Sequence, residues 1–336
     1  MQSLRDCHGR QLKKSPVSTI AMTDAPVKQL WLPTPAGPRL NVIHFPSRAT
    51  APKVIITHGA FSRASFLLRL SHFLHHQGFE VWLFEWRGHG DSDPDDGSTN
   101  YESLAEVDLQ TVLLHVTQHS QGSAPIFFVG HSVGGVLPWM LLARHPELRS
   151  LVAGVVSIGS QITGAGSSLA RRAGLLGIAA AVHLLDGAPC SVFRVGPNDE
   201  AKGVMSQWVS WNRQGQWLGY DGFDYSHASS QVQVPALLLA GGGDTLVAPL
   251  HGVAQLHAAL GSADKTLLHC ARSAGFAEDY THGGLVCSPA AMQELWPLIA
   301  TWIARATRYT LPLGQGMGGQ GERNEMSSAK ARYADP

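Results

Sequence analysis

The sequence predicts an α/β fold, a mostly parallel sheet covered by helices on both faces. Short apolar runs rich in β-branched residues alternate with longer amphipathic stretches, which is the pattern of parallel strands joined by crossover helices. Of the 336 residues, 44% are hydrophobic and 15% are charged, so a large core is expected. One apolar run, residues 126–129, leads directly into a Gly-x-Ser-x-Gly pentapeptide centred on Ser132, and a helical pattern follows over residues 136–145.

The first half of the chain opens with an antiparallel pair. Residues 27–32 and 40–45 are divided by a proline-rich turn, and this arrangement predicts a hairpin at the sheet edge. Gly78 is expected to end the first helix as its C-cap. The other predicted elements of this half are strands at 53–57, 81–85, 126–129 and 151–158 and helices at 64–77, 101–119 and 136–145.

The alternation of strands and helices is interrupted over residues 160–232. This stretch has no strand-helix rhythm but is rich in tryptophan and tyrosine, and we interpret it as an insertion, a mainly helical cap over the carboxyl edge of the sheet. The alternation resumes with strands at 235–240 and 265–269 and helices at 250–260 and 289–308. The predicted organisation is a flexible leader at 1–26, a core formed by 27–159 and 233–311, the cap at 160–232 and a flexible tail at 312–336.

Charge and composition exclude several classes of function. The net charge is +0 with no basic cluster, so no nucleic-acid partner is expected. No apolar stretch reaches the roughly 18 residues of a membrane span and no secretory signal is visible, so we expect no integral membrane segment and a cytoplasmic location. The four cysteines and 17 histidines form no paired metal-ligand spacing, so no metal site is predicted. The oligomeric state stays open.

The Gly-x-Ser-x-Gly pentapeptide has the strand before it and the helix after it that a nucleophile elbow requires. Ser132 is therefore the candidate nucleophile, at a strained turn where side chains at Gly130 or Gly134 would collide with neighbouring backbone. A chance match in a chain with 36 glycines is the alternative.

A serine nucleophile needs a histidine base oriented by a carboxylate, and in this topology the acid and then the histidine follow the serine along the chain. Asp244 comes directly after the strand predicted at 235–240, although an Asp there could simply form a turn. His282 lies between the last strand and the final helix, where a histidine is often only a loop residue. Asp279 is too near His282 in sequence to be a firm orienting group.

Two backbone N–H groups are needed to bind the oxyanion of the intermediate. We expect them to come from Val133, after the nucleophile, and from Ala60, with Phe61 as the second choice. Gly59 would let this loop pass close to the elbow. The nearby histidines, His58, His89 and His131, are assigned mainly to structure.

With these residues in place, the chain resembles the α/β-hydrolase family, in its serine esterase/lipase-like branch, over about residues 27–308. The resemblance implies a mostly parallel eight-stranded sheet, no cofactor, and hydrolysis through an acyl-enzyme at Ser132. Gly284 stands where related enzymes often have an Asp, and a serine nucleophile argues against the branches that use aspartate. The matching pieces are Thr57-His58-Gly59-Ala60-Phe61, Trp86-Arg87-Gly88-His89-Gly90-Asp91-Ser92, Gly130-His131-Ser132-Val133-Gly134-Gly135, Gly243-Asp244 and Asp279-Tyr280-Thr281-His282.

The expected substrate is a small ester with an apolar acyl or alcohol part. Candidate substrate-binding residues are Phe61, His131, Trp208 and Trp211, although such tryptophans can equally attach a small cap to the body. No pattern gives a role to the polar residues of the insertion, Arg194, Asn198, Glu200 and Lys202. The same triad could act on a thioester or a carbon–carbon bond or transfer an acyl group, and a non-catalytic binding protein on this fold is the alternative from another class.

Overall fold

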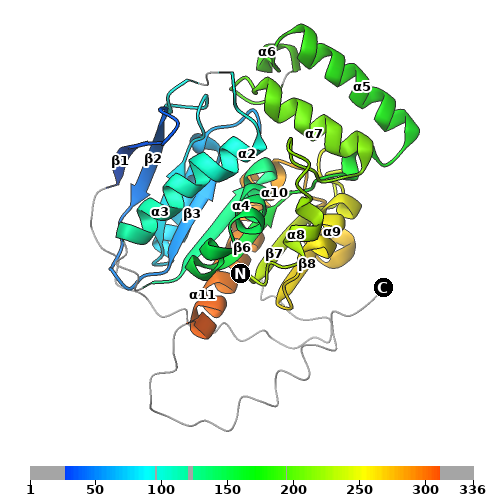
Figure 1. Ribbon diagram of the computed structural model, residues 1–336. Coiled ribbons are helices and arrows are strands. Elements are labelled where there is room, and N and C mark those ends of the chain that lie inside the picture. Colours follow the sequence, from blue (N-terminus) through cyan, green and yellow to red (C-terminus); the bar gives the residue numbers. More distant parts are fainter. Residues whose placement is uncertain (1–26, 95–96, 120–123, 194, 311–336) are drawn as a thin grey trace.

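The computed structural model describes residues 27–94, 97–119, 124–193 and 195–310 (Figure 1), so the predicted leader and tail lie outside the described residues. It contains an eight-stranded sheet with the order β1-β2-β4-β3-β5-β6-β7-β8, in which β2 runs in the direction opposite to the other strands. The predicted fold class is confirmed. The strands are β1 Lys28–Pro33, β2 Arg39–Phe45, β3 Lys53–Thr57, β4 Glu80–Phe84, β5 Ile126–His131, β6 Val152–Ile158, β7 Ala236–Gly241 and β8 Lys265–Cys270.

Helices cover both faces of the sheet (Figure 1), so the central strands are buried on both sides and read as continuous apolar runs. One face packs against α2, α3, α4, α8 and α9, and the other against α1, α10 and α11. The helices are α1 Leu68–His76, α2 Tyr101–Ser103, α3 Gln110–His119, α4 Leu137–Arg144, α5 Leu169–Leu184, α6 Cys190–Phe193, α7 Lys202–Gln214, α8 Tyr225–Ser229, α9 Leu250–Ala259, α10 Gly284–Cys287 and α11 Pro289–Thr310.

The single helix predicted over 101–119 is wrong in one detail. A wide π-helical turn, Leu104–Leu109, separates α2 from α3. Asp108 lies in this turn and is fully buried, where its carboxylate accepts hydrogen bonds from the backbone N–H and the guanidinium of Arg87, at 3.0 and 2.5 Å. This buried pair ties the loop after β4 to the helix that packs beside it. Interruptions of this kind are hard to foresee from periodicity.

The segment between β6 and β7 is helical, as expected of the insertion. In Figure 1, α5, α6 and α7 lie together at one end of the molecule, away from the layers that flank the sheet. The short α8 packs against the body through Tyr225, which is fully buried in the main core, and Val204 and Trp211 of α7 belong to the same core. We use the name inserted segment for residues 160–214. Among the described helices, none has the length and apolar character required to cross a membrane.

Candidate active site

Ser132 lies at the sharp turn between β5 and a short 3₁₀ turn, Ser132–Gly135, and its φ is +56°. This left-handed conformation is rare for a residue with a side chain and marks local strain at functional sites. A Cβ atom added to Gly130 would lie 2.1 Å from the carbonyl oxygen of Gly134, so no larger residue fits there. The local geometry is that of the predicted nucleophile elbow.

The loop after β3 passes directly beside this elbow. A Cβ atom on Gly59 would come within 2.7 Å of the Ser132 Cβ, which explains why the loop needs glycine there. Phe61 has a φ of +59°, and its backbone N–H donates a 2.9 Å hydrogen bond to Oε2 of Glu200. Because the N–H of Phe61 already donates to Glu200, the N–H of Ala60 is the better candidate of the two for binding the oxyanion.

Val133 is the second residue of the 3₁₀ turn, and the first N–H groups of a helical turn have no partner within it. We use the name oxyanion loop for residues 58–62. The structure brings the oxyanion loop and the N–H of Val133 to the same end of the sheet, where β3 and β5 are neighbours.

Asp244 and His282 are joined by a hydrogen bond of 2.6 Å between Nδ1 of the imidazole and Oδ2 of the carboxylate. Asp244 lies in the loop after β7, and the backbone N–H groups of Val247 and Ala248 donate to its other oxygen, at 3.2 and 3.0 Å. With Nδ1–H donating to Asp244, Nε2 carries the lone pair, which is the tautomer that a general base needs.

The electrostatic environment keeps Asp244 ionised. Its side chain is only 2% exposed, and burial alone would raise its pKa. The hydrogen bond and charge of His282, together with the two backbone N–H groups, outweigh burial and hold the pKa of Asp244 below its usual value. The carboxylate is therefore available to orient the imidazole throughout the neutral range.

The loops that carry the acid and the base are tied to each other and to the core. The backbone N–H of Gly243 donates to the carbonyl oxygen of Tyr280 at 3.0 Å. The buried ring of Tyr280 extends its hydroxyl to Glu294 on α11, at 2.7 Å. Asp279, considered as an orienting group, instead accepts the backbone N–H of Arg272 at 3.0 Å.

Ser132 and His282 line one cavity of about 640 Å³. Of the predicted oxyanion and substrate-binding residues, Ala60, Val133, Phe61, His131 and Trp208 line it as well. Sequence reasoning missed most of its other walls, which come from the segment before α1, α2, α5, α6, the segment before α7, α7 and the loop after β7. The principal additional residues are Arg63, Phe66, Tyr101, Ile178, Phe193, Val195, Pro197, Val204, Met205 and Val247.

Trp211 lies elsewhere, and its predicted contact with substrate is not supported. Its ring is buried against Tyr101, with ring centroids 4.5 Å apart, and its Nε1–H donates to the carbonyl oxygen of Leu218 at 2.7 Å. Trp208 and Trp211 are three residues apart on α7, so their directions differ by only about 60° around the helix axis. The edge of the cavity falls between them, because Trp208 lines the cavity and Trp211 does not. Trp211 holds the helix to the body, the alternative expected for such tryptophans.

The neighbouring histidines are assigned by their contacts. His58 uses Nδ1 to hydrogen-bond the carbonyl oxygen of Gly59 at 2.9 Å, a structural role as expected. His89 places Nε2 3.3 Å from Glu200 Oε2. His131 lines the cavity but donates its Nε2–H to the carbonyl oxygen of His282 at 3.0 Å, and burial lowers its pKa to about 3.

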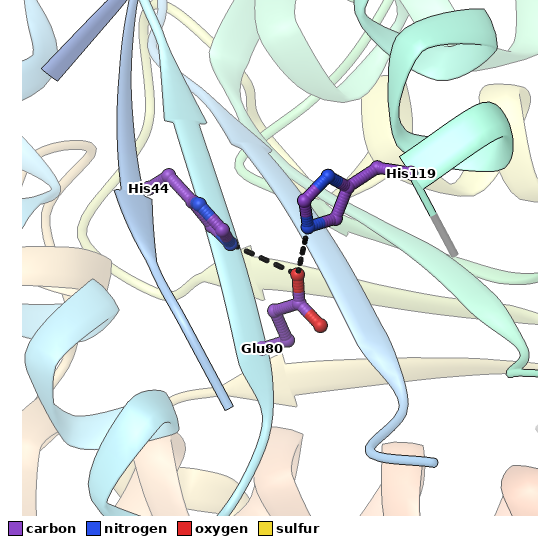
Figure 2. A group of neighbouring side chains, drawn as sticks. All are labelled: His44, Glu80 and His119. Carbon is purple, nitrogen blue, oxygen red and sulfur yellow. Dashed lines mark hydrogen bonds and ion pairs between the residues drawn. The ribbon is translucent and has the colours of Figure 1, made fainter. Parts of the chain in front are cut away.

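One group among the described residues has the donor types of a metal site, at the opposite end of the sheet. Figure 2 shows His44 from β2 and His119 from α3 directed at one oxygen of Glu80 from β4, at 2.9 and 3.8 Å. The ammonium of Lys53 bonds the other oxygen of Glu80 at 2.5 Å. A divalent cation would stand beside this buried ammonium, so we interpret the group as an ion network that joins β2, β3 and β4.

The chain is similar in part to known proteins. Residues 48–187 match the family described as serine aminopeptidase, S33. The sn-1-specific diacylglycerol lipase ABHD11 of Mus musculus is 30% identical over 115 residues, which are 33% of this chain and 35% of the lipase. A probable alcohol acetyltransferase of Saccharomyces cerevisiae is 33% identical over 102 residues, 30% of this chain and 29% of that protein. The chain thus matches about a third of the length of these curated relatives.

Among solved structures, the monoacylglycerol lipase of Paleococcus ferrophilus has the same fold, with a TM-score of 0.57 and 19% identity. The alignment covers 80% of this chain and 99% of the lipase chain. At that identity the likeness concerns the fold. The family match, residues 48–187, includes the loop after β3 and Ser132 but not Asp244 or His282.

Proposed function

We propose that this chain, which has the α/β-hydrolase fold and matches the serine aminopeptidase S33 family over residues 48–187, hydrolyses carboxylic esters through an acyl-enzyme at Ser132. The observation that carries the proposal is the 2.6 Å bond between Asp244 and His282, beside a cavity that both His282 and Ser132 line. The strained φ of Ser132 supports the same assignment.

In the proposed reaction, Nε2 of His282 takes the hydroxyl proton of Ser132 as Oγ attacks the ester carbonyl carbon. The carbonyl electrons move onto oxygen, and the N–H groups of Ala60 and Val133 bind that oxyanion. When the tetrahedral intermediate collapses, the alcohol leaves with the proton from His282. Water then attacks the acyl-enzyme with the same histidine as base, and the acid and free Ser132 are released.

The substrate class is proposed from the cavity. Its walls are mainly aromatic and aliphatic, with Phe61 from the loop after β3 and with Phe193, Met205 and Trp208 from the inserted segment. An apolar acyl or alcohol group would fill this space, while the ester carbonyl faces Ser132. We also propose that α5, α6 and α7 act as a cap, whose contribution is to keep water from the bound chain.

A fluorophosphonate probe tests the nucleophile directly. The wild-type protein should be labelled at Ser132 and should cleave p-nitrophenyl esters, while Ser132→Ala should lose both properties with its folding intact. Asp244→Asn should fold and retain the probe site, but kcat should fall on the order of 10³–10⁴-fold because the imidazole loses its orienting charge. An unlabelled wild-type protein without esterase activity would instead support a binding protein on this fold.

Acyl transfer is the second candidate, because one relative is a probable alcohol acetyltransferase. The two reactions share the acyl-enzyme and differ in whether an alcohol or water attacks it. Supplying ethanol together with a short-chain p-nitrophenyl ester separates them, since a transferase forms the ethyl ester in preference to the free acid. Acyl-CoA and diketone substrates in the same panel would reveal thioester or carbon–carbon cleavage.

A further inference from the structure

The side chain of Glu200 reaches from the inserted segment into the body of the protein and is completely buried, with 0% exposure. Glu200 precedes α7 and pairs with Ala188 through two backbone hydrogen bonds of 2.9 and 3.0 Å. These bonds fix its backbone within the inserted segment, so the carboxylate is presented to the oxyanion loop from a rigid support.

Phe61 is held by the inserted segment through both of its backbone polar groups. Its N–H donates to Oε2 of Glu200 at 2.9 Å, and its carbonyl oxygen accepts the backbone N–H of Asn198 at 3.2 Å. Gly196 also lies against this carbonyl, since a Cβ there would be 2.0 Å from the oxygen. A residue at φ +59° is strained unless its surroundings hold it, and these contacts supply that restraint.

The other contacts of Glu200 explain why a carboxylate occupies this position. Oε1 accepts the backbone N–H of Ala201 at 3.1 Å, and Nε2 of His89 lies 3.3 Å from Oε2. His89 comes from the loop after β4, so one carboxylate joins three segments that are distant in sequence. A buried carboxylate is tolerated when its oxygens are satisfied in this way.

We propose that Glu200 is a positioning residue of the oxyanion loop, which fixes the peptide of Phe61 and thereby aims the N–H of Ala60 at the substrate oxyanion. The inference rests on the proposed function of that loop. It makes the catalytic centre depend on the seating of the inserted segment: when α7 and Glu200 move away from the body, Phe61 loses its acceptor and the donor geometry relaxes.

The experiment compares Glu200→Ala and Glu200→Gln in full-length protein with a p-nitrophenyl ester. Glu200→Ala should lower kcat about 10–100-fold with little change in KM, because the misplaced donor matters mainly in the transition state. Glu200→Gln keeps an oxygen acceptor for Phe61 N–H, and its kcat should stay within about threefold of the wild type.

The affinity for a transition-state analogue distinguishes a positioning role of Glu200 from a purely structural one. A trifluoromethyl ketone adds Oγ of Ser132 to its carbonyl carbon, places the resulting oxyanion in the hole and leaves the serine proton on His282. Its affinity should weaken about 10-fold or more in Glu200→Ala, whereas the inhibition constant of the carboxylic acid product should change less than about threefold.

Asp199→Ala is the matched control, since Asp199 is the neighbouring carboxylate and accepts the N–H of Cys190 within the inserted segment. It should leave kcat and the ketone affinity near wild-type values, and melting temperatures should show all variants folded. Equal losses in Asp199→Ala and Glu200→Ala would overturn the inference, as would a Glu200→Ala variant with unchanged kcat. If the wild type itself is neither labelled nor active, the proposed function fails instead.

Discussion

The imidazole of His131 donates its Nε2–H to the backbone carbonyl oxygen of His282 at 3.0 Å, so the residue beside Ser132 holds the loop that carries His282. The two rings lie 4.6 Å apart between centroids. Burial and the nearby His282 lower the pKa of His131 to about 3, so its ring stays neutral at physiological pH. This hydrogen bond joins the end of β5 to the loop of His282.

Replacing His131 by Leu should make the position of the His282 imidazole less fixed without unfolding the protein. The variant loses one buried hydrogen bond, worth about 1 kcal/mol, and leaves the carbonyl of His282 without that donor. We expect kcat for a p-nitrophenyl ester to fall roughly 10-fold with KM little changed. Steady-state kinetics and a thermal melt measure both effects. Unchanged kcat in a folded variant would show that the loop needs no such support.

The buried pair of His89 and Glu200 gives a pH dependence of stability. Burial opposes the charge of His89, but Glu200, the carbonyl of Arg87 and the charge of Glu85 together raise its pKa above the usual value of 6.5. Because the pKa of His89 is raised in the folded state, its charge stabilises the protein fully below about pH 6.5. This stabilisation is lost as the pH rises through the pKa of His89 in the folded state.

Against His89→Gln, which does not titrate, the wild-type advantage in free energy of unfolding should therefore be constant at low pH and decline above pH 6.5. Urea unfolding at several pH values between 5 and 9 measures it. An advantage that grows as the pH rises would contradict the assignment of a charged His89 facing Glu200. His58, whose ring centroid lies 5.2 Å from that of His89, has a pKa well below its usual value through burial and does not add charge here.

Lys53 should contribute strongly to stability through its bond to Glu80. Its side chain is 1% exposed and that of Glu80 is 4% exposed. Burial opposes the charge of Glu80, but hydrogen bonds from His44 and Lys53 hold its pKa below the usual value. Lys53→Met leaves the carboxylate buried without its cation and should lower the free energy of unfolding by about 3–5 kcal/mol.

Lys202→Met is the matched control, because Lys202 pairs with Asp186 at the surface, where both side chains are exposed. Exposed pairs are screened by water, so this variant should unfold at the same urea concentration as the wild type. Both variants should retain kcat, since neither residue lines the cavity. Equal stability of Lys53→Met and the wild type would mean that the network is not a stabilising one.

The sequence alone predicts the features that depend on local patterns and on order along the chain, and not those that depend on how distant segments pack. The elbow at Ser132 and the positions of Asp244 and His282 follow from local strand-turn patterns and from their order along the chain, so they can be predicted from the sequence. The contact between Glu200 and Phe61 joins residues 139 positions apart. It depends on how the inserted segment folds against the body, and no local spacing encodes that.

The inserted segment also decides between the two alternatives predicted for its tryptophans, a wall of the cavity or attachment to the body. Sequence periodicity shows that Trp208 and Trp211 lie on one helix, but it does not give the rotation of that helix about its axis. In the structure α7 turns Trp208 to the cavity and Trp211 to Tyr101 in the core. Packing against the body decides this rotation, and it is a tertiary property.

Trp208→Leu should change the preference for acyl chain length. The indole is one wall of the cavity, and a smaller side chain leaves room for additional methylene groups. Each methylene that fits a hydrophobic pocket changes specificity by about 10-fold or more, so the ratio of kcat/KM for long over short p-nitrophenyl esters should rise by at least about 10-fold. Trp211→Leu, three residues away, should lose about 3 kcal/mol of stability and keep the wild-type ratio. If both variants shift the ratio equally, the indole of Trp208 does not define the acyl site, and the bound chain must lie along another wall of the cavity.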